Sequence, residues 1–145
     1  MGMFGAIDAS ASGLTAERLR MDVISNNIAN VNTTRTTEGG PYRRQMVVFQ
    51  SRENEQASFS KILAQQTEVG AGVRVTGIIK DNSPLRRIYE PNHPDADRDG
   101  YVNMPNINVV AEMVDMISAT RSYEANVTAI NSAKSMAAKA LEIGK

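Results

Sequence analysis

Hydrophobic residues recur at helical spacing near the start of the chain. Between residues 6 and 31 they fall seven apart, with companions three or four residues further on. This pattern predicts one amphipathic helix with a coiled-coil seam. The apolar seam positions are Ile7, Leu14, Met21, Ile24, Ile28 and Val31. Because Ser10 and Glu17 interrupt the companion row, the predicted seam is incomplete.

The last third of the chain carries a second helical pattern, in which apolar positions alternate by four and three residues. It predicts a helix of about 50 Å from residue 106 or 108 to Ile143. An asparagine such as Asn108 suits the N-cap, and Glu112 and Asp115 suit the positive end of the helix dipole. The apolar seam positions are Val109, Met113, Met116, Tyr123, Val127, Ile130 and Leu141.

The centre of the chain has a different pattern, in which β-branched residues are separated by Gly, Pro and Asn. We predict strands at residues 42–50, 69–80 and 85–89, because these runs are rich in Val, Ile and Tyr. Residues 51–67 are polar and predict an excursion or a short helix, and residues 91–100 predict an irregular loop.

The fold class predicted is mainly α with a small β-rich insert, an α+β arrangement. The helical parts are residues 1–34 and 106–145, and the insert is residues 35–105. Because the insert joins the helices, they most simply lie antiparallel, as a coiled-coil-like hairpin. An intramolecular hairpin and a seam between subunits need the same spacing, so the pattern leaves both open. Helices this long extend beyond what the insert can cover, so we expect partners to order them.

Composition narrows the classes of function. The 145 residues include 16 basic and 16 acidic ones, and this zero net charge argues against nucleic-acid or anionic-lipid binding. Eight Met and no Trp favour adaptable packing at interfaces. Cysteine is absent, which excludes disulfides and thiolate chemistry. No apolar run approaches the ~20 residues of a membrane span, and the N-terminal pattern is not that of a cleaved signal.

Candidate chemistry is sparse. Asp95, Asp97 and Asp99 imitate the first half of an EF-hand loop, but Asn106 stands where the bidentate Glu belongs. We therefore prefer a solvated turn to a calcium site, and a calcium- or ligand-binding module stays a remote alternative. His93 is the single histidine, and no nucleophile with its base is present. We expect no catalytic, metal or cofactor site.

Two short basic pairs lie in or beside the predicted strands, Arg43–Arg44 and Arg86–Arg87. We interpret both as edge charges that discourage unwanted strand pairing. Ion pairs to a neighbouring subunit are the alternative.

Two segments resemble one known family. Residues 24–34, ISNNIANVNTT, resemble the N-terminal signature of flagellar rod, hook and hook-associated proteins, and residues 108–126 resemble their C-terminal motif. The short length and the segment YEPNHP at residues 89–94 resemble the proximal-rod members. The residues that carry the signature are Asn26, Asn27, Asn30, Asn32, Thr33, Glu112, Met113, Arg121, Tyr123, Glu124 and Asn126.

The resemblance implies a structural subunit of the proximal rod of the bacterial flagellar basal body. Such proteins leave the cell through the flagellar type III export apparatus without a cleaved signal. They assemble in the periplasm, with other rod proteins and copies of themselves, into a hollow shaft that transmits torque. It also implies that the signature asparagines bond to adjacent subunits. Another axial protein of the same family is the closest alternative. We expect no nucleic-acid partner and no membrane insertion.

Overall fold

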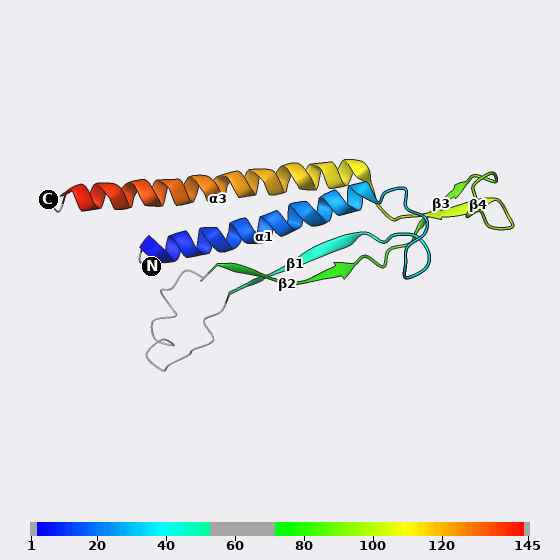
Figure 1. The fold of residues 1–145 in the computed structure, drawn as a ribbon, viewed down its shortest axis with the longest axis horizontal. Coiled ribbons are helices and arrows are strands. Elements are labelled where there is room, and N and C mark those ends of the chain that lie inside the picture. Colours follow the sequence, from blue (N-terminus) through cyan, green and yellow to red (C-terminus); the bar gives the residue numbers. More distant parts are fainter. Residues whose placement is uncertain (1–2, 53–71, 144–145) are drawn as a thin grey trace, which may run out of the picture. The chain divides into compact units, whose positions relative to one another are not determined.

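The computed structural model describes residues 3–52 and 72–143 (Figure 1). Within these residues, one helix lies near each end of the chain and four short strands lie between the helices. This confirms a mixed α and β fold with terminal helices. The elements are α1 (Met3–Ala29), β1 (Gln45–Ser51), β2 (Val73–Lys80), β3 (Arg86–Tyr89), β4 (Tyr101–Met104) and α3 (Val109–Ile143). The prediction made for residues 51–67 lies largely outside the described residues.

Local sequence explains where the helices begin and end. Asn108 caps α3, because its side-chain oxygen accepts hydrogen bonds from the backbone N–H groups of Val110 (3.0 Å) and Ala111 (3.3 Å). α1 ends at Ala29, where the N–H of Asn30 bonds to the carbonyls of both Asn26 and Asn27. The predicted ends therefore differ from the observed ones by a few residues.

The strands form two separate two-stranded sheets. In the first sheet, Asp81 N–H donates to the Arg44 carbonyl (2.8 Å) and Arg52 N–H donates to the Gly72 carbonyl (2.9 Å). The start of β1 thus faces the end of β2, so the pair is antiparallel. The second sheet pairs β3 with β4, also antiparallel. β4 was not predicted, because its four residues lie between the turn-forming residues Gly100 and Pro105 and include Asn103, a residue type uncommon in strands.

The chain divides into two compact units. Unit 1 contains residues 1–19, 48–77 and 119–145, and unit 2 contains residues 20–47 and 78–118. Both helices contribute residues to both units. Neither helix of the described chain is long and apolar enough to cross a membrane.

Unit 1 is held by close approach of small residues. A Cβ on Gly13 would lie 2.9 Å from the side-chain nitrogen of Asn126, so α1 and α3 pass within direct contact there. Gly72 has φ +102°, and a Cβ on it would lie 2.3 Å from the hydroxyl of Ser12. That hydroxyl accepts a hydrogen bond from Val73 N–H (3.0 Å) and donates to the carbonyl of Ala9 (2.7 Å). The helix and the start of β2 are therefore joined where side chains are smallest.

Unit 2 has a more conventional core. Val23 and Ile24 of α1 are buried, as are Val102, Met104 and Ile107 in and after β4. Burial alternates along β4. Val102 and Met104 therefore lie on the inner face of the hairpin, and Tyr101 and Asn103 lie on its outer face.

Candidate functional site: a buried polar network and an exposed apolar helix face

Asn27 lies at the centre of a polar network in unit 2, although its side chain is only 1% exposed. Its amide nitrogen donates to the Gln45 carbonyl (2.9 Å), and its amide oxygen accepts from Gln45 N–H (2.9 Å). The amide thus pairs with the backbone at the start of β1 as a neighbouring strand would. Tyr42 also donates to the amide oxygen (3.2 Å), so the side chain has its hydrogen bonds inside the chain.

Glu112 of α3 completes this network. Its carboxylate is fully buried and accepts from the amide nitrogen of Asn27 (3.0 Å) and from Nε of Arg44. Arg44 also binds Asp115, one turn further along α3, at 3.1 Å, and Arg20 approaches Asp115 at 3.7 Å. One guanidinium therefore holds two carboxylates on the same face of the helix. The interpretation of Arg44 as a solvated edge charge is wrong, because its guanidinium forms ion pairs with Glu112 and Asp115 inside unit 2.

The charges of the network alter the acidity of its members. Burial of the guanidinium acts to lower the pKa of Arg44, but the hydrogen bond and charge of Glu112 and the charges of Asp115 and Asp81 outweigh it, so this pKa is raised. Burial, and then the charge of Glu112, raise the pKa of Tyr42 above 10.0. Both groups therefore stay protonated as hydrogen-bond donors at neutral pH.

The opposite face of the same turns of α3 is apolar and exposed. Four residues at spacing i, i+3, i+4 and i+7 form it, and we call them the α3 stripe: Val110 (71% exposed), Met113 (56%), Val114 (60%) and Ile117 (55%). A helix on the surface of a globular protein normally buries its apolar face and exposes its polar one. Here the arrangement is reversed, because Glu112 is inside and the stripe is outside.

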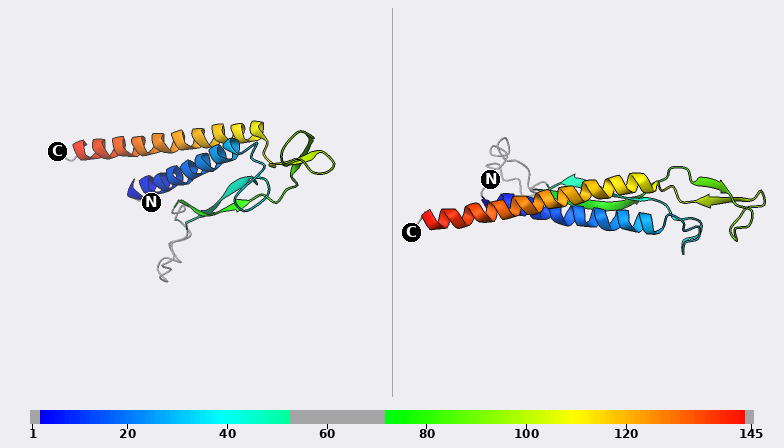
Figure 2. Two further views of the ribbon diagram at one scale, coloured as in Figure 1. Left: turned by 45° about the vertical axis from the view of Figure 1, so that its right-hand side comes forward. Right: turned by 90° about the horizontal axis from the view of Figure 1, so that it is seen from above.

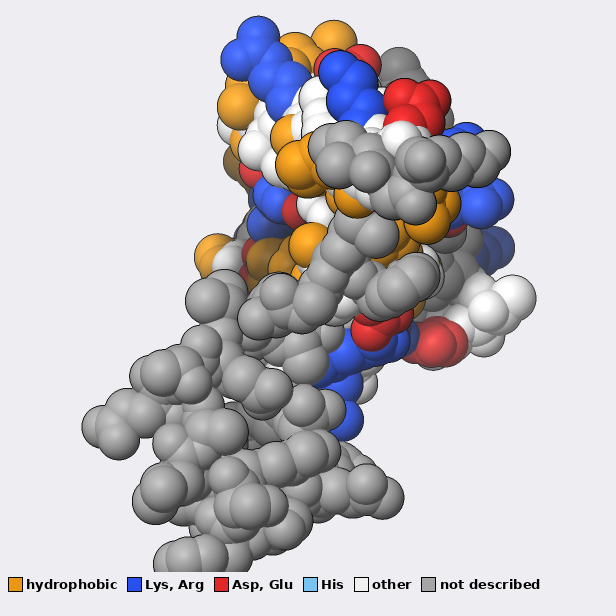
Figure 3. Space-filling view, turned by 90° about the vertical axis from the view of Figure 1, so that its left-hand side faces the viewer, with side chains coloured by type: hydrophobic (Ala, Val, Ile, Leu, Met, Phe, Trp, Pro, Cys, Tyr) orange, Lys and Arg blue, Asp and Glu red, His pale blue; other side chains and the backbone are white. Residues whose placement is uncertain are grey.

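The helix seam predicted from the sequence has mixed exposure. In α1, Ile24 is buried and the other seam residues are half-buried: Ile7, Leu14, Met21, Ile28 and, just after the helix, Val31. In α3, Met116, Tyr123, Val127 and Ile130 are half-buried, whereas Val109, Met113 and Leu141 are exposed. Hydrophobic side chains also reach the surface between charged ones in the space-filling view (Figure 3).

The signature residues are not brought together as one cluster. Asn27 and Glu112 meet in the network. Asn26 and Asn30 bond to each other (3.2 Å), and Thr33 donates to Asn30 (3.1 Å) at the end of α1. The remaining signature residues have other positions: Asn32, Arg121 and Glu124 are exposed, and Tyr123 and Asn126 are half-buried.

Sequence reasoning missed Arg44 and Tyr42 as members of the network. It assigned Glu112 to the positive end of the helix dipole and not to a buried position. A signal was nevertheless present: Glu112 and Asp115 lie one turn apart beside an apolar row, where an acidic pair needs a cation if it faces inward.

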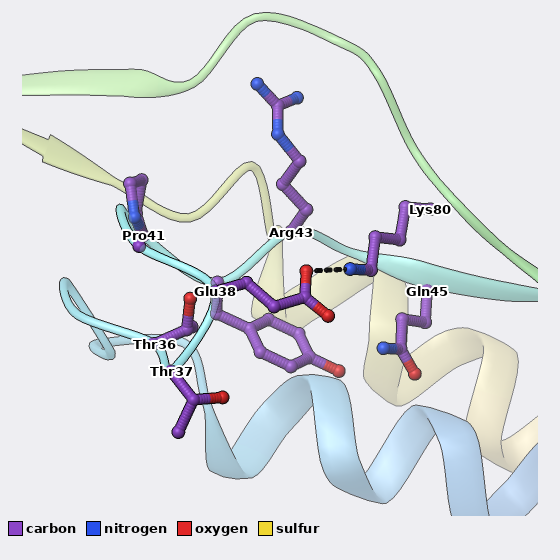
Figure 4. A pocket seen from close by; sticks show the side chains of 9 residues that line it. Thr36, Thr37, Glu38, Pro41, Arg43, Gln45 and Lys80 are labelled. Carbon is purple, nitrogen blue, oxygen red and sulfur yellow. Dashed lines mark hydrogen bonds and ion pairs between the residues drawn. The ribbon is translucent and has the colours of Figure 1, made fainter.

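A shallow hollow of about 440 Å³ lies beside this network in unit 2 (Figure 4). Lys80 forms an ion pair with Glu38 across it, and Arg43 points away from that pair. The carboxylate and the amine in this lining therefore neutralise each other.

The acidic loop after β3 is committed to contacts within unit 2. Asp95 accepts from Thr34 (2.8 Å) and Arg35 (2.6 Å), and its N–H donates to the ring of His93 (3.1 Å). The hydrogen bond from Thr34, with a smaller effect of the charge of Arg35, lowers the pKa of Asp95. Within residues 3–52 and 72–143, no three potential metal ligands gather at one point.

Two family models match the chain. Residues 7–35 match the family described as flagella basal body rod protein, and residues 98–143 match the flagellar basal body rod FlgEFG protein C-terminal family. These matches contain Asn27 and Glu112, the two residues that meet at the centre of the network.

Full-length relatives agree with both models. The chain is 54% identical to the flagellar basal-body rod protein FlgC of Borreliella burgdorferi, over 99% of this chain and 98% of the relative. It is 50% identical to the FlgC protein of Bacillus subtilis and 38% identical to that of Salmonella typhimurium, in both cases over the whole of each chain. The chain therefore belongs to the FlgC family of flagellar basal-body rod proteins.

Proposed function

We propose that this protein is a structural subunit of the flagellar basal-body rod that polymerises through its terminal helices. The observation that carries the proposal is the reversed polarity of α3. Its first turns use a buried ion pair on one face and present the α3 stripe on the other. A lone soluble domain has no reason to expose such a face, whereas a subunit of a polymer has.

Energetics support an interface at the α3 stripe. Burying one Val, Ile or Met side chain stabilises by about 1.5–3 kcal/mol, so a partner that covers four of them gains several kcal/mol. Polar groups of these turns already have partners inside unit 2, so covering the stripe leaves no buried charge unpaired. The seam residues Ile28, Val127 and Ile130 are half-buried, so each keeps some apolar area that a neighbouring subunit could cover.

We further propose that the two helices form an antiparallel, coiled-coil-like hairpin. Two contacts in unit 2 support this direction, because Arg20 contacts Asp115 whereas Asn27, further along α1, contacts the earlier residue Glu112. In this proposal residues 1–34 and 106–145 form the core tube of the rod, and residues 35–105 lie outside it.

The same proposal covers the setting of the protein. The relatives are named as basal-body rod proteins, which supports assembly with other rod components. Assembly with further copies of this chain is part of the proposal. Contacts that repeat without closing generate a helical polymer, which can carry torque from motor to hook without chemical turnover. Passage through the type III export apparatus to the periplasm belongs to this proposal, as does the absence of enzymatic activity.

Substitution within the α3 stripe tests the proposal. Val114→Glu places a charge at the centre of the stripe, and we expect it to abolish rod assembly and swimming in a strain that lacks the wild-type copy. Because Val114 is 60% exposed, the circular dichroism of the purified monomer should not change. Ser132→Glu is the matched control, since Ser132 is also exposed on α3 but lies outside the stripe.

The seam is tested separately by Ile28→Asp and Ile130→Asp. We expect both to prevent assembly and motility while expression and export persist. Normal swimming by Val114→Glu would show that the α3 stripe is not an interface. Normal swimming by both seam variants would show that the predicted seam is not needed for assembly.

A further inference from the structure

The β3–β4 hairpin is a second exposed surface, separate from the helices. It projects beyond the end of α1 and the start of α3 in the three ribbon views (Figures 1 and 2). Ile88 and Val102 pair on its inner face. The outer face carries Arg87, Tyr89, Tyr101 and Asn103, which are all exposed.

The register leaves the backbone of β3 unpaired along one edge. Glu90 N–H donates to the Gly100 carbonyl (2.9 Å), so residues 90 and 100 form a hydrogen-bonded pair. Pairs alternate along an antiparallel ladder, so Arg87 and Tyr89 belong to non-bonded pairs and their N–H and C=O groups point away from β4. The carbonyl of Tyr101 does point away from β3, because it accepts from Asp97 N–H (2.8 Å).

The two edges of the hairpin therefore differ. The loop that carries Asp97 covers part of the β4 edge. The β3 edge has no further strand among the described residues, because the sheet contains only β3 and β4. An uncovered edge of this kind accepts an added strand.

The side chains along the β3 edge form a rigid aromatic and basic surface. Tyr89, 62% exposed, meets Tyr101 edge-to-face with ring centroids 5.3 Å apart. The guanidinium of Arg87 lies 4.9 Å from the Tyr101 ring centroid. Tyr89 also lies so close to Gly100 that a Cβ there would approach its ring to 2.8 Å. Tyr and Arg held in this way are the residues most frequent at the centres of protein interfaces.

Charge indicates which partner fits. Neither Arg86 nor Arg87 forms an ion pair within the described part of the chain, and both are exposed. Pairing with the same edge of a second copy would bring together the two arginines of each copy against one carboxylate of each copy, that of Glu90, so positive charge would be in excess. An extended segment that carries Asp or Glu would instead supply the missing anions.

We propose that the free edge of β3 binds an extended acidic segment of another protein by strand addition. The backbone groups of Arg87 and Tyr89 bond to the added strand, and the carboxylates on its outer face pair with Arg87. This surface does not depend on helix-mediated assembly, so either proposal can fail without the other.

A peptide titration with the full chain tests the proposal. The probe is a capped, labelled peptide of alternating Glu and Val, and fluorescence anisotropy reports its binding. One matched peptide has Lys in place of every Glu. The other keeps Glu but carries N-methyl groups on the alternate amides that face the β3 edge. We expect the N-methylated peptide to bind about tenfold more weakly, because strand addition needs these donors. The Lys peptide should not bind.

Variants of the protein locate the binding site. Arg87→Glu should weaken binding of the Glu–Val peptide by about tenfold, because it replaces attraction with repulsion. Arg98→Glu makes the same charge change at an exposed position in the hairpin loop, away from the edge, and should have less than about a twofold effect. Circular dichroism checks that both variants keep the fold.

Three results would overturn the proposal. The first is no binding of the Glu–Val peptide by the wild-type chain. The second is binding of the N-methylated peptide as tight as that of the unmodified peptide, or a loss of affinity in Arg98→Glu as large as in Arg87→Glu. Either outcome would mean that general charge attraction explains the binding. The third is a dimer of this chain, detected by light scattering, that Arg87→Glu dissociates, since a second copy would then be the occupant of the edge.

Discussion

The first and the later turns of α3 bury different kinds of residue. Up to Ser118, in unit 2, the fully buried side chain is the carboxylate of Glu112, and the apolar residues face outward. From Ala119 onward, in unit 1, the buried residues are the alanines Ala119 and Ala133, and charged residues such as Glu124 and Lys134 are exposed. One continuous helix thus has two packing regimes.

This difference shows that the two units depend on different physical interactions. Unit 2 adds to its apolar core a few directional bonds, in which the loss of one partner leaves a buried charge or amide with fewer partners. Unit 1 depends on close approach of backbones, in which added volume rather than lost polarity is damaging. Substitutions that remove atoms should therefore harm unit 2, and substitutions that add atoms should harm unit 1.

The largest expected effect is in unit 2, for Glu112→Ala. This change leaves Arg44 without its closest anion and removes one of the two acceptors of the Asn27 amide nitrogen, and breaking a buried pair in this way destabilises by about 3–5 kcal/mol. Urea unfolding followed by circular dichroism measures it. Glu124→Ala, on the exposed face of unit 1, should change the free energy of unfolding by less than about 0.5 kcal/mol.

Glu112→Gln separates charge from shape in this experiment. The amide keeps the side-chain volume and one acceptor. The free energy of unfolding should therefore fall less in Glu112→Gln than in Glu112→Ala. An alanine variant as stable as the Glu124→Ala control would contradict the central role of the network.

An intermediate effect is expected in unit 1, for Gly72→Ala. The added methyl meets the hydroxyl of Ser12 and must break its bond to Val73, so we expect a loss of about 2–3 kcal/mol. Gly40→Ala is the matched control, because Gly40 also has positive φ (+77°) but nothing within 4 Å. It should lose only about 1 kcal/mol, from backbone strain. Equal losses in the two variants would mean that the contact with Ser12 does not matter.

The smallest effect is expected for the exposed ion pair of Glu38 and Lys80. The hydrogen bond and charge of Lys80 lower the pKa of Glu38 below its ordinary value of 4.5. Any contribution of the pair to stability is therefore fully present above pH 4.5 and is lost as the pH falls through the lower folded-state pKa. Solvent screening should make Glu38→Gln indistinguishable from wild type in urea unfolding at neutral pH. A clear loss there would mean that charge, rather than burial, decides which ion pairs matter.

Much of the fold was predictable from the sequence because its signals are local. The periodicity of both helices, the cap at Asn108 and the β-branched runs of β1 to β3 all depend on neighbours within a few residues. β4 was not predictable, because its four residues become a strand only by pairing with β3.

The network was the part that sequence reasoning could not assemble. Asn27 and Glu112 were singled out by their resemblance to a family signature, but the two residues are 85 positions apart and nothing local relates them. Arg44 was misinterpreted for the same reason, since its partner Glu112 lies 68 positions away. The exposed apolar positions Val110, Val114 and Ile117 were missing from the predicted seam, because a heptad pattern assigns the inner face to the regular row.

The sequence by itself determined two terminal helices, a small β-rich insert and membership of a flagellar axial family, since helix periodicity and signature motifs are properties of contiguous residues. Only the tertiary structure decided which face of each helix is buried. That choice depends on whether a polar side chain finds a buried partner from elsewhere in the chain, and Asn27 with Arg44 provides one for Glu112. With the polar face satisfied inside, the apolar face of α3 is left for a neighbour.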